Sequence, residues 1–252
     1  MNHLELETLL NTKLSSGAIK DYCPNGLQVE GKTEITKIVT GVTASQALIE
    51  KAIEREADAI LVHHGYFWKG EPESIRGMKG NRIRSLMKHD INLYGYHLPL
   101  DVHPVLGNNA ELARLLDIEV KGGLESKEPS IALYGELKEP MRGTAFAQKI
   151  TRVLNRKPLH ITPEIGDSLI KTVGWCTGGG QDYIELAAQH NLDAFISGEI
   201  SERTTYTARE RNIHYFSAGH HATERYGIKA LGEWVAREFG LDVEFIDIDN
   251  PV

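Results

Sequence analysis

Short runs of β-branched and other apolar residues alternate along the chain with amphipathic stretches. The runs predict strands, and the stretches with apolar positions three and four residues apart predict helices. We expect strands at residues 35–42, 58–64, 91–97, 171–176, 193–198, 213–219 and 241–248, and helices at 47–56, 81–88, 109–116, 182–190, 202–210 and 223–239. Strands and helices in this alternation predict an α/β fold with largely parallel pairing.

The two halves of the chain carry related patterns. The matched segments are KIV at 37–39 with KTV at 171–173, DAILVHH at 58–64 with DAFISGE at 193–199, and YHLPLD at 96–101 with GHHATE at 219–224. The offsets are 134, 135 and 123, so the first two differ by one residue inserted in the intervening loop. We interpret the pattern as a degenerate duplication of a strand–helix–strand–helix–strand unit.

A boundary between two lobes is expected at KGGLESKEP, residues 121–129, which is rich in Gly, Lys and Glu. We therefore expect a first α/β lobe at 1–125 and a second at 126–252, with elements free to interleave between them. A length of 252 residues suits one or two domains and is ample for a buried core.

Composition restricts the class of protein. Hydrophobic residues make up 41% and charged residues 25%, which excludes disordered and fibrous chains. The net charge of −7 argues against a nucleic-acid binder, which needs a basic face. Two cysteines, Cys23 and Cys176, are too few for a disulfide framework. No apolar run is long enough to span a membrane, and the N-terminus lacks the basic region of a signal peptide, so we expect a cytoplasmic setting.

Several of the 11 histidines cluster at predicted strand ends. His63 and His64 end a buried strand, at the edge where parallel α/β sheets bind ligands. Neighbouring strand residues point to opposite faces, so both imidazoles reach one site only if the strand ends there. Gly65 is consistent with such a turn. Asp101 follows the strand at 91–97 by a short loop, so it also lies at this edge.

His220 and Glu224 are four residues apart, which places them on one side of a helix that begins near His221. His221 is the alternative to His220, but the four-residue spacing favours His220. Imidazole and carboxylate together suit Zn, Fe, Mn or Co. Three histidines and two carboxylates exceed the ligand set of one catalytic zinc and fit two ions ~3.5–4 Å apart. For any single motif, a hydrogen-bonded core histidine is the competing interpretation.

The sequence also resembles a known family. Its blocks are PNGLQVEG (24–31), HHGYFWK (63–69), HLPLDVHPVLGNNAELA (97–113), SGE (197–199) and AGHHATER (218–225). In order and spacing they are similar, nearly end to end, to the GTP cyclohydrolase 1 type 2 homologues, also called the NIF-three-like family. The resemblance implies two interlinked, pseudo-duplicated three-layer α/β lobes with a dinuclear metal site in the cleft between them. It also implies toroidal homohexamers.

Carried over residue by residue, the resemblance places the metal ligands on His63, His64, Asp101, His220 and Glu224. These are the residues that the spacing argument selects. His97 also matches a family position. We expect it to orient Asp101 or a bound water and to serve as the catalytic group that manages a proton.

The family name suggests a metal-dependent hydrolase that holds two divalent ions, such as Fe, Zn or Mn, and opens the imidazole ring of a nucleotide such as GTP with loss of formate. This is hydrolysis of C–N bonds. The alternative is a non-catalytic metal-binding protein with a regulatory or interaction role, which binds metal tightly without turnover. No membrane or sequence-specific nucleic-acid partner is expected.

Three further segments leave alternatives open. The glycine-rich turn at 177–180 could cradle a phosphate or serve as a tight packing turn. Basic residues at 69–84 could attract a nucleotide or form a solvated helix face. The aromatic residues at 66–68 could stack on a base or pack in the core.

Overall fold

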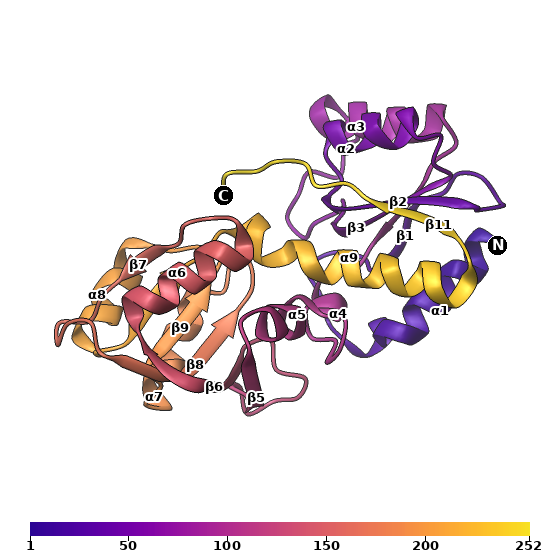
Figure 1. Cartoon of the computed structure of the whole chain (residues 1–252). Coiled ribbons are helices and arrows are strands. Elements are labelled where there is room, and N and C mark those ends of the chain that lie inside the picture. Colours follow the sequence, from indigo (N-terminus) through magenta and orange to yellow (C-terminus); the bar gives the residue numbers. More distant parts are fainter. The chain divides into compact units, whose positions relative to one another are not determined.

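The computed structural model describes residues 1–252 as two compact units, and the chain contributes two segments to each (Figure 1). Unit 1 comprises Met1–Gly107 and Gly227–Asp249; unit 2 comprises Asn108–Tyr226 and Asn250–Val252. The division expected at residue 125 falls inside unit 2. The reason is that strand β5 (Ile118–Gly123) pairs antiparallel with β6 (Leu133–Arg142), so residues 121–129 belong to a hairpin of that unit.

Unit 1 is built on a five-stranded sheet in the order β1-β4-β3-β2-β11. Four strands run parallel, and the edge strand β1 is antiparallel to β4. The strands are β1 (Gly26–Val29), β2 (Lys37–Thr43), β3 (Ala59–His64), β4 (Asn92–Gly95) and β11 (Asp242–Phe245). The helices are α1 (His3–Leu14), η1 (Ser16–Ala18), α2 (Gln46–Glu54), α3 (Gly77–Lys88), α4 (Leu98–Asp101) and the unit 1 part of α9 (His220–Phe239).

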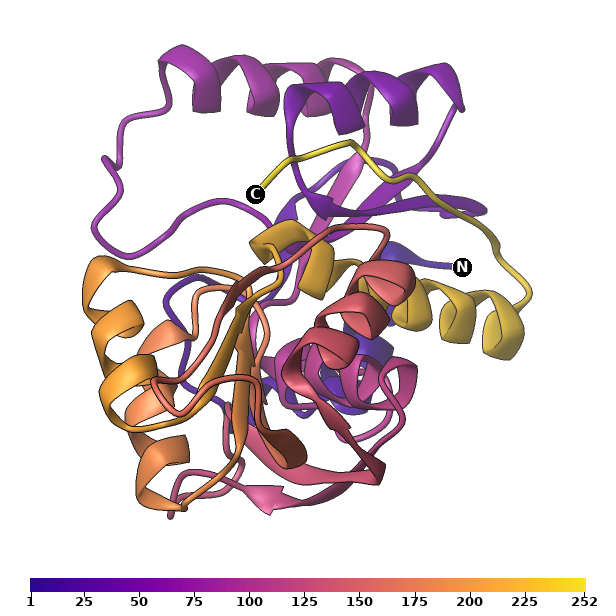
Figure 2. The ribbon, with the colours of Figure 1, turned by 60° about the vertical axis from the view of Figure 1, so that its left-hand side comes forward.

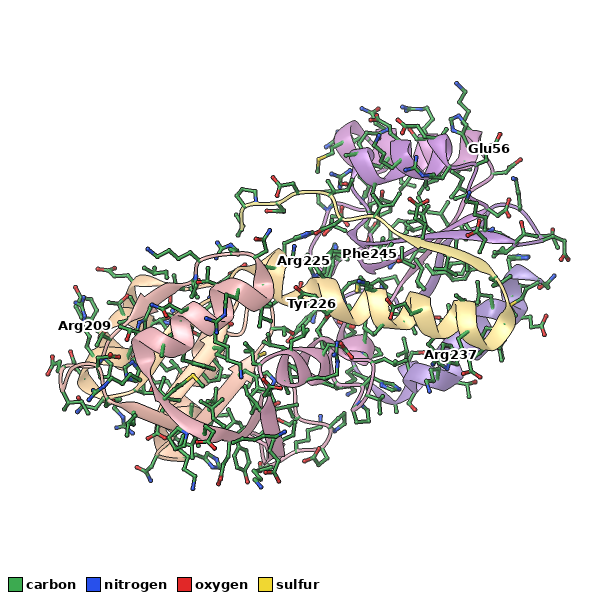
Figure 3. All side chains as sticks on the ribbon, in the orientation of Figure 1. Glu56, Arg209, Arg225, Tyr226, Arg237 and Phe245 are labelled. Carbon is green, nitrogen blue, oxygen red and sulfur yellow. The ribbon has the colours of Figure 1, made fainter.

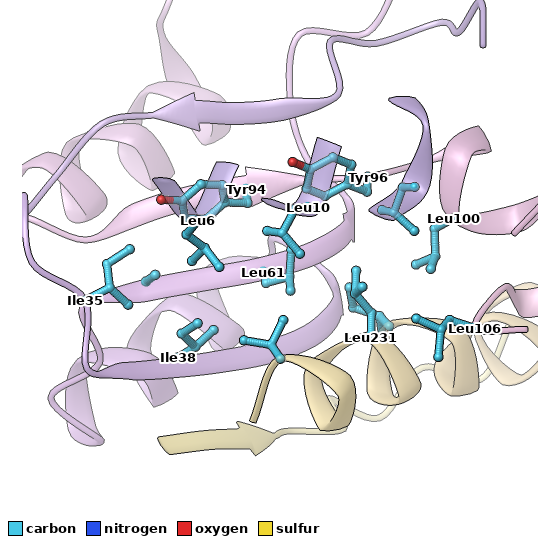
Figure 4. Close-up of a cluster of buried hydrophobic side chains, with 14 of the residues drawn as sticks. Leu6, Leu10, Ile35, Ile38, Leu61, Tyr94, Tyr96, Leu100, Leu106 and Leu231 are labelled. Atoms are coloured by element: carbon cyan, nitrogen blue, oxygen red, sulfur yellow. The ribbon is translucent and has the colours of Figure 1, made fainter. Parts of the chain in front are cut away.

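Alternating side chains give this sheet two apolar faces. One face packs against α1 and α9; its buried cluster includes Leu6, Leu10, Ile38, Leu61, Tyr94 and Leu231 (Figure 4). The opposite face packs against α2 and α3; its cluster includes Val39, Leu48, Ile60, Ile83 and Leu93. Residues next to each other in sequence, such as Ile60 and Leu61, therefore serve different layers, as the two-residue period of a strand requires. The result is a three-layer α/β/α unit.

Unit 2 has a six-stranded sheet in the order β5-β6-β8-β9-β10-β7. Strands β8, β9 and β10 are parallel, and the outer strands are antiparallel to their neighbours. The remaining strands are β7 (Leu159–Ile161), β8 (Leu169–Cys176), β9 (Ala194–Ser197) and β10 (His214–Ser217). The helices are α5 (Asn108–Leu115), α6 (Gly143–Leu154), η2 (Gln181–Tyr183), α7 (Ile184–Gln189) and α8 (Glu202–Glu210).

The second sheet is also covered on both faces. Phe146 of α6 packs edge-on against Phe216 of β10, within a cluster that also contains residues of α5. Residues of α7 and α8 cover the other face, where the cluster includes Phe195 and Tyr215. Figure 2 shows α6 and α8 on opposite sides of the strands. The predicted α/β class and its three layers are therefore confirmed in both units.

Strand register confirms the internal duplication and corrects its alignment. Ile38 pairs with Ala59 in unit 1, and Val173 pairs with Ala194 in unit 2. Both residues of the second pair lie 135 positions after their counterparts, so no residue is inserted between these strands and the offset of 134 was wrong. The offset of 134 matches Lys37 with Lys171 because both are lysine. These side chains lie at the end of a strand, where no core packing determines which residues correspond.

A buried aspartate anchors the first strand in each unit. Asp58 Oδ2 accepts hydrogen bonds from the backbone N–H groups of Thr36 and Lys37 and from the Thr36 hydroxyl, at 2.9–3.1 Å. Asp193 Oδ2 accepts the equivalent three bonds from Lys171 and Thr172. Each carboxylate directly precedes one parallel strand and bonds to the start of the neighbouring one. It therefore holds the two strand starts side by side.

We expect Asp58→Ala to lower the free energy of unfolding by about 2–4 kcal/mol, because it leaves backbone N–H groups without their acceptor. Urea unfolding of the variant measures this, and Asp249→Ala, at an exposed position, is the control. An Asp58→Ala protein as stable as the control would contradict the anchoring role.

The first residue of the third parallel strand differs between the units. Asn92 of β4 accepts a hydrogen bond from the backbone N–H of Gly31 and donates one to the Lys32 carbonyl. His214 of β10 lies instead between Ser168 Oγ, at 3.0 Å, and His160 Nε2, at 2.9 Å. Burial lowers the pKa of both imidazoles, and the pKa of His160 falls to about 4, with the neighbouring His214 adding to the effect.

This depressed pKa makes unit 2 sensitive to acid. Folded His160 stays neutral down to about pH 4, whereas the unfolded chain binds a proton near pH 6.5. The unfolded state therefore gains protons first, and stability falls as the pH drops from 6.5 to 4, by roughly 2–3 kcal/mol. Urea unfolding across this window should show a shallower pH dependence for His160→Gln than for the control His89→Gln, which alters an exposed imidazole. Equal slopes would refute the assignment.

Helix α9 belongs to both units. Near its start, Arg225 donates to the Leu154 carbonyl and the Tyr226 hydroxyl donates to the Val153 carbonyl, all within unit 2 (Figure 3). Beyond Gly227 the same helix supplies apolar residues to the unit 1 core: Ile228, Leu231 and Val235. No helix of the chain has the length and apolar character that crossing a membrane requires.

Candidate functional site

His63 lies at the carboxyl end of β3, where parallel pairing brings β2, β3 and β4 to a common edge. Its ring Nδ1 is 2.9 Å from the carbonyl oxygen of Tyr96. Because a carbonyl only accepts, Nδ1 carries the hydrogen of this contact, and Nε2 is on the opposite side of the ring. That Nε2 is 3.5 Å from Oδ1 of Asp101, the last residue of α4. Two of the predicted ligands thus face each other within unit 1.

His64, the last residue of β3, turns toward the same region. Its ring centroid is 4.5 Å from that of His63, and its Nδ1 is 3.3 Å from the Thr43 hydroxyl. Donor atoms of His63, His64 and His97 all lie within 4.8 Å of one another, a spacing at which they could hold a cation. The two neighbouring imidazoles therefore approach each other, as a strand that ends at His64 allows.

Gly65 is needed for close approach rather than for an unusual backbone conformation. The Gln28 side-chain oxygen accepts a hydrogen bond from the Tyr66 N–H at 2.7 Å. That oxygen lies 2.1 Å from the position that a Cβ on Gly65 would occupy. Any larger residue would displace Gln28, which belongs to the block at 24–31, from the end of β3.

His97, which directly precedes α4, is held by the segment before β1. Its Nδ1 is 2.7 Å from Asp21 Oδ1, and its backbone N–H donates to Asn25 Oδ1 at 2.8 Å. Burial alone would raise the pKa of Asp21, but hydrogen bonds from His97 and Asn25 and the His97 charge lower it to about 2. His97 was expected to orient Asp101 or a water; the partner seen for its Nδ1 is Asp21.

His220 and Glu224 lie in the first turns of α9, in unit 2. His220 Nε2 is 3.1 Å from Glu224 Oε2, so the predicted four-residue spacing does bring the two side chains together. The opposite ring nitrogen, Nδ1, is 2.7 Å from Glu199 Oε1. Burial by itself would lower the pKa of His220, but the hydrogen bonds and charges of Glu224 and Glu199 raise it to about 9.

Each unit therefore carries a histidine whose Nδ1 is fixed by a carboxylate at 2.7 Å: His97 by Asp21 and His220 by Glu199. Such a carboxylate sets the tautomer and orientation of an imidazole and turns Nε2 to the opposite side of the ring. Sequence reasoning did not assign roles to Asp21 and Glu199. The block SGE at 197–199 was the signal for Glu199, and the proximity of Asp21 to the block at 24–31 was the signal for Asp21.

The glycine-rich turn at 177–180 follows β8 and packs against the start of α9. The Gly178 N–H donates to the Thr223 hydroxyl and the Gly180 N–H to the Ser197 hydroxyl, both at 3.0 Å. A Cβ on Gly178 would come within 2.1 Å of Glu224 Oε1. Since these amides already bond to the protein, the turn is better explained by close packing beside Glu224 than by phosphate binding.

The aromatic residues at 66–68 have different environments. Tyr66 is buried, and its hydroxyl donates to the Ala44 carbonyl. The Trp68 ring lies edge-on to His97, with 4.9 Å between ring centroids, and its Nε1–H donates to the Gly65 carbonyl. Phe67, 36% exposed, is the most open of the three. Trp68 thus forms an apolar wall beside the histidines.

We expect Glu199→Gln to weaken divalent-cation binding by His220 by roughly 10–100-fold, because the amide does not hold the imidazole as a carboxylate does. Competition against a chelating dye measures the affinity. Glu202→Gln, at an exposed position near the start of α8, is the matched control and should bind as the unaltered chain does. Unchanged affinity in Glu199→Gln would show that this carboxylate does not support a ligand.

Comparison with known proteins finds relatives along the whole chain. The family model described as Duf34/NIF3 (NGG1p interacting factor 3) matches residues 1–251. The curated relatives called "GTP cyclohydrolase 1 type 2 homolog" include proteins of Vibrio cholerae, 71% identical over 252 residues, and Haemophilus influenzae, 69% identical over 251 residues. Both alignments cover 100% of each chain.

Solved structures have the same fold. The protein ybgI, described as of unknown function, is 56% identical with a TM-score of 0.97, and TTHA1606 from Thermus thermophilus is 31% identical with a TM-score of 0.89. Both comparisons cover 100% of each chain. A Bacillus cereus protein related to NIF3, 16% identical, shares the fold alone, with a TM-score of 0.88 over 100% of this chain and 98% of its own.

Proposed function

This chain belongs to the Duf34/NIF3 family, and on that premise we propose that it is a metal-dependent hydrolase that acts on a nucleotide. The observation that carries the proposal is the approach of His63 Nε2 to Asp101 Oδ1, 3.5 Å, at the ligand-binding edge of a parallel sheet. The name "GTP cyclohydrolase 1 type 2 homolog" of the relatives makes GTP the first substrate to test.

The proposed cation ligands are His63, His64 and Asp101 from unit 1 and His220 and Glu224 from unit 2. We propose, as the family resemblance implies, that these five residues serve as the ligands of two divalent cations. Within each unit, imidazole nitrogen and carboxylate oxygen already face each other at 3.5 and 3.1 Å. This mixture of nitrogen and oxygen donors suits Fe, Zn, Mn or Co, so the residues fit the cations that the family resemblance implies.

Bound cations would supply a water of lowered pKa near neutral pH. The protein's own contribution is to hold and move protons. With Nδ1 fixed on the ionised Asp21, His97 presents Nε2 as a proton acceptor and then a donor. For GTP, one water opens the imidazole ring by cleaving a C–N bond, and a second releases formate from the resulting formamide. Trp68 would limit the entry of other water beside His97.

We also propose that the chain works in the cytoplasm as a ring of six copies. Support for the ring comes from the family resemblance. Support for the location comes from the two cysteines, Cys23 and Cys176, which are too few for a disulfide framework. Light scattering of the purified protein tests the number of copies.

We expect the metal-loaded protein to release formate from GTP and His64→Ala to do so at least ~10²-fold more slowly, because one proposed ligand is lost. Formate is measured enzymatically and bound metal by elemental analysis. The control is His89→Ala, since His89 is exposed on the surface of unit 1. Equal turnover by His64→Ala and the control would refute the assignment of His64 to a metal-dependent hydrolase site.

Metal content separates this proposal from the alternative. Two cations per chain without turnover on a panel of nucleotides and phosphoesters would favour the non-catalytic metal-binding protein. If the two ligand sets share a pair of cations, Glu224→Gln should weaken the binding of both ions. Loss of only one ion, with the other unaffected, would indicate separate sites.

A further inference from the structure

A second group of potential ligands lies in unit 1 and contains none of the five proposed cation ligands, although its His97 adjoins His63 and His64. The segment between η1 and β1 contributes Asp21 and Cys23, and the residue before α4 contributes His97. One carboxylate oxygen, the thiol sulfur and one imidazole nitrogen all lie within 4.8 Å of one another. We propose that Asp21, Cys23 and His97 form an additional cation site, selective for thiophilic divalent ions such as Zn²⁺.

The donor set gives this site its selectivity. It contains a sulfur, whereas the five residues of the proposed hydrolase site offer only nitrogen and oxygen. Thiolate, imidazole and carboxylate are the usual ligands of tetrahedral zinc, with Zn–S about 2.3 Å and Zn–N about 2.0–2.1 Å. Ligand atoms around one such ion are therefore roughly 3–4 Å apart, and the three atoms here already lie within 4.8 Å of one another. Three protein ligands leave the fourth position for water.

The site is largely preorganised. Asp21 Oδ2 accepts hydrogen bonds from the Leu98 N–H at 2.8 Å and from Asn25 Nδ2 at 2.9 Å. The Asp21 side chain is 1% exposed and the His97 side chain 15%, so neither is free to swing into solvent. Cys23 is a free, half-buried thiol in the same segment. Cation binding would require only that the Cys23 thiol lose its proton and that the proton between His97 and Asp21 be displaced.

Charge balance favours a divalent cation there. A carboxylate and a thiolate together carry two negative charges, which one divalent ion neutralises, and the histidine binds in its neutral form. Occupation displaces the thiol proton and the proton that His97 Nδ1 shares with Asp21 Oδ1 at 2.7 Å. A cation bound here would also remove His97 from any role in moving protons, so zinc in excess would act as an inhibitor through this site.

Cobalt substitution tests the proposal in the full chain. Co²⁺ bound through sulfur gives an intense near-ultraviolet charge-transfer absorption, and Co²⁺ bound only through nitrogen and oxygen does not. We expect this band in the unaltered protein, its loss together with one Co²⁺ per chain in Cys23→Ser, and its retention in Cys176→Ser. Cys176 is the matched control because it is the only other cysteine.

A protein that binds Co²⁺ without the sulfur band, or whose band survives Cys23→Ser, would overturn the proposal. X-ray absorption of the zinc-loaded, unaltered chain gives an answer that needs no variant: a sulfur shell at about 2.3 Å supports the site, and its absence refutes it. The proposed hydrolase site has no sulfur ligand. Absence of formate release from Cys23→Ser, in which this additional site is lost, therefore counts against the hydrolase alone, and an active protein that shows no sulfur band counts against this site alone.

Discussion

Parallel pairing of three strands is the constraint on which the candidate chemistry of each unit depends. Strands β2, β3 and β4 must end at one edge because they run in the same direction, and β8, β9 and β10 obey the same rule. His63 and His64 therefore stand beside the segment that follows β4, which carries His97 and Asp101. The register that delivers them is held at the other end of the strands by Asp58 and, in unit 2, by Asp193.

The duplication explains why the two units use similar devices with different residues. Both have an aspartate that bonds to the start of the first parallel strand, and both have a histidine with its Nδ1 on a carboxylate. The carboxylates Asp21 and Glu199 come from different loops, so the second device is shared in geometry but not in sequence position.

The sequence was sufficient for the parallel core because its strands are continuous apolar runs, as in residues 58–64, and the i, i+4 relation located His220 and Glu224. The sequence pattern did not predict the antiparallel strands at the edges of the two sheets. Strand β5 buries Ile118 but leaves its next three residues exposed, so its pattern does not resemble a core strand. Helix α1 is not among the predicted helices, although Leu6, Leu10 and Leu14 repeat every four residues and are buried.

The partners of the histidines were beyond sequence reasoning for a different reason. Contacts such as Asp21–His97 join residues separated by 76 positions and depend on how an irregular segment closes over the sheet. Periodicity carries information about helices and strands, but none about such segments. The one-residue error in the internal alignment has a similar origin, since exposed residues at strand ends are not constrained by packing.

The passage of α9 through both units has a consequence for biosynthesis. Unit 1 contains residues 1–107, yet Ile228, Leu231 and Val235 of its core are translated long after them, once all of unit 2 up to Tyr226 has been made. One apolar face of the nascent sheet is therefore covered by α1 without α9 until that helix has been made, and apolar surface left exposed in this interval favours aggregation. A chain that ended after α8 would therefore leave part of that apolar face exposed.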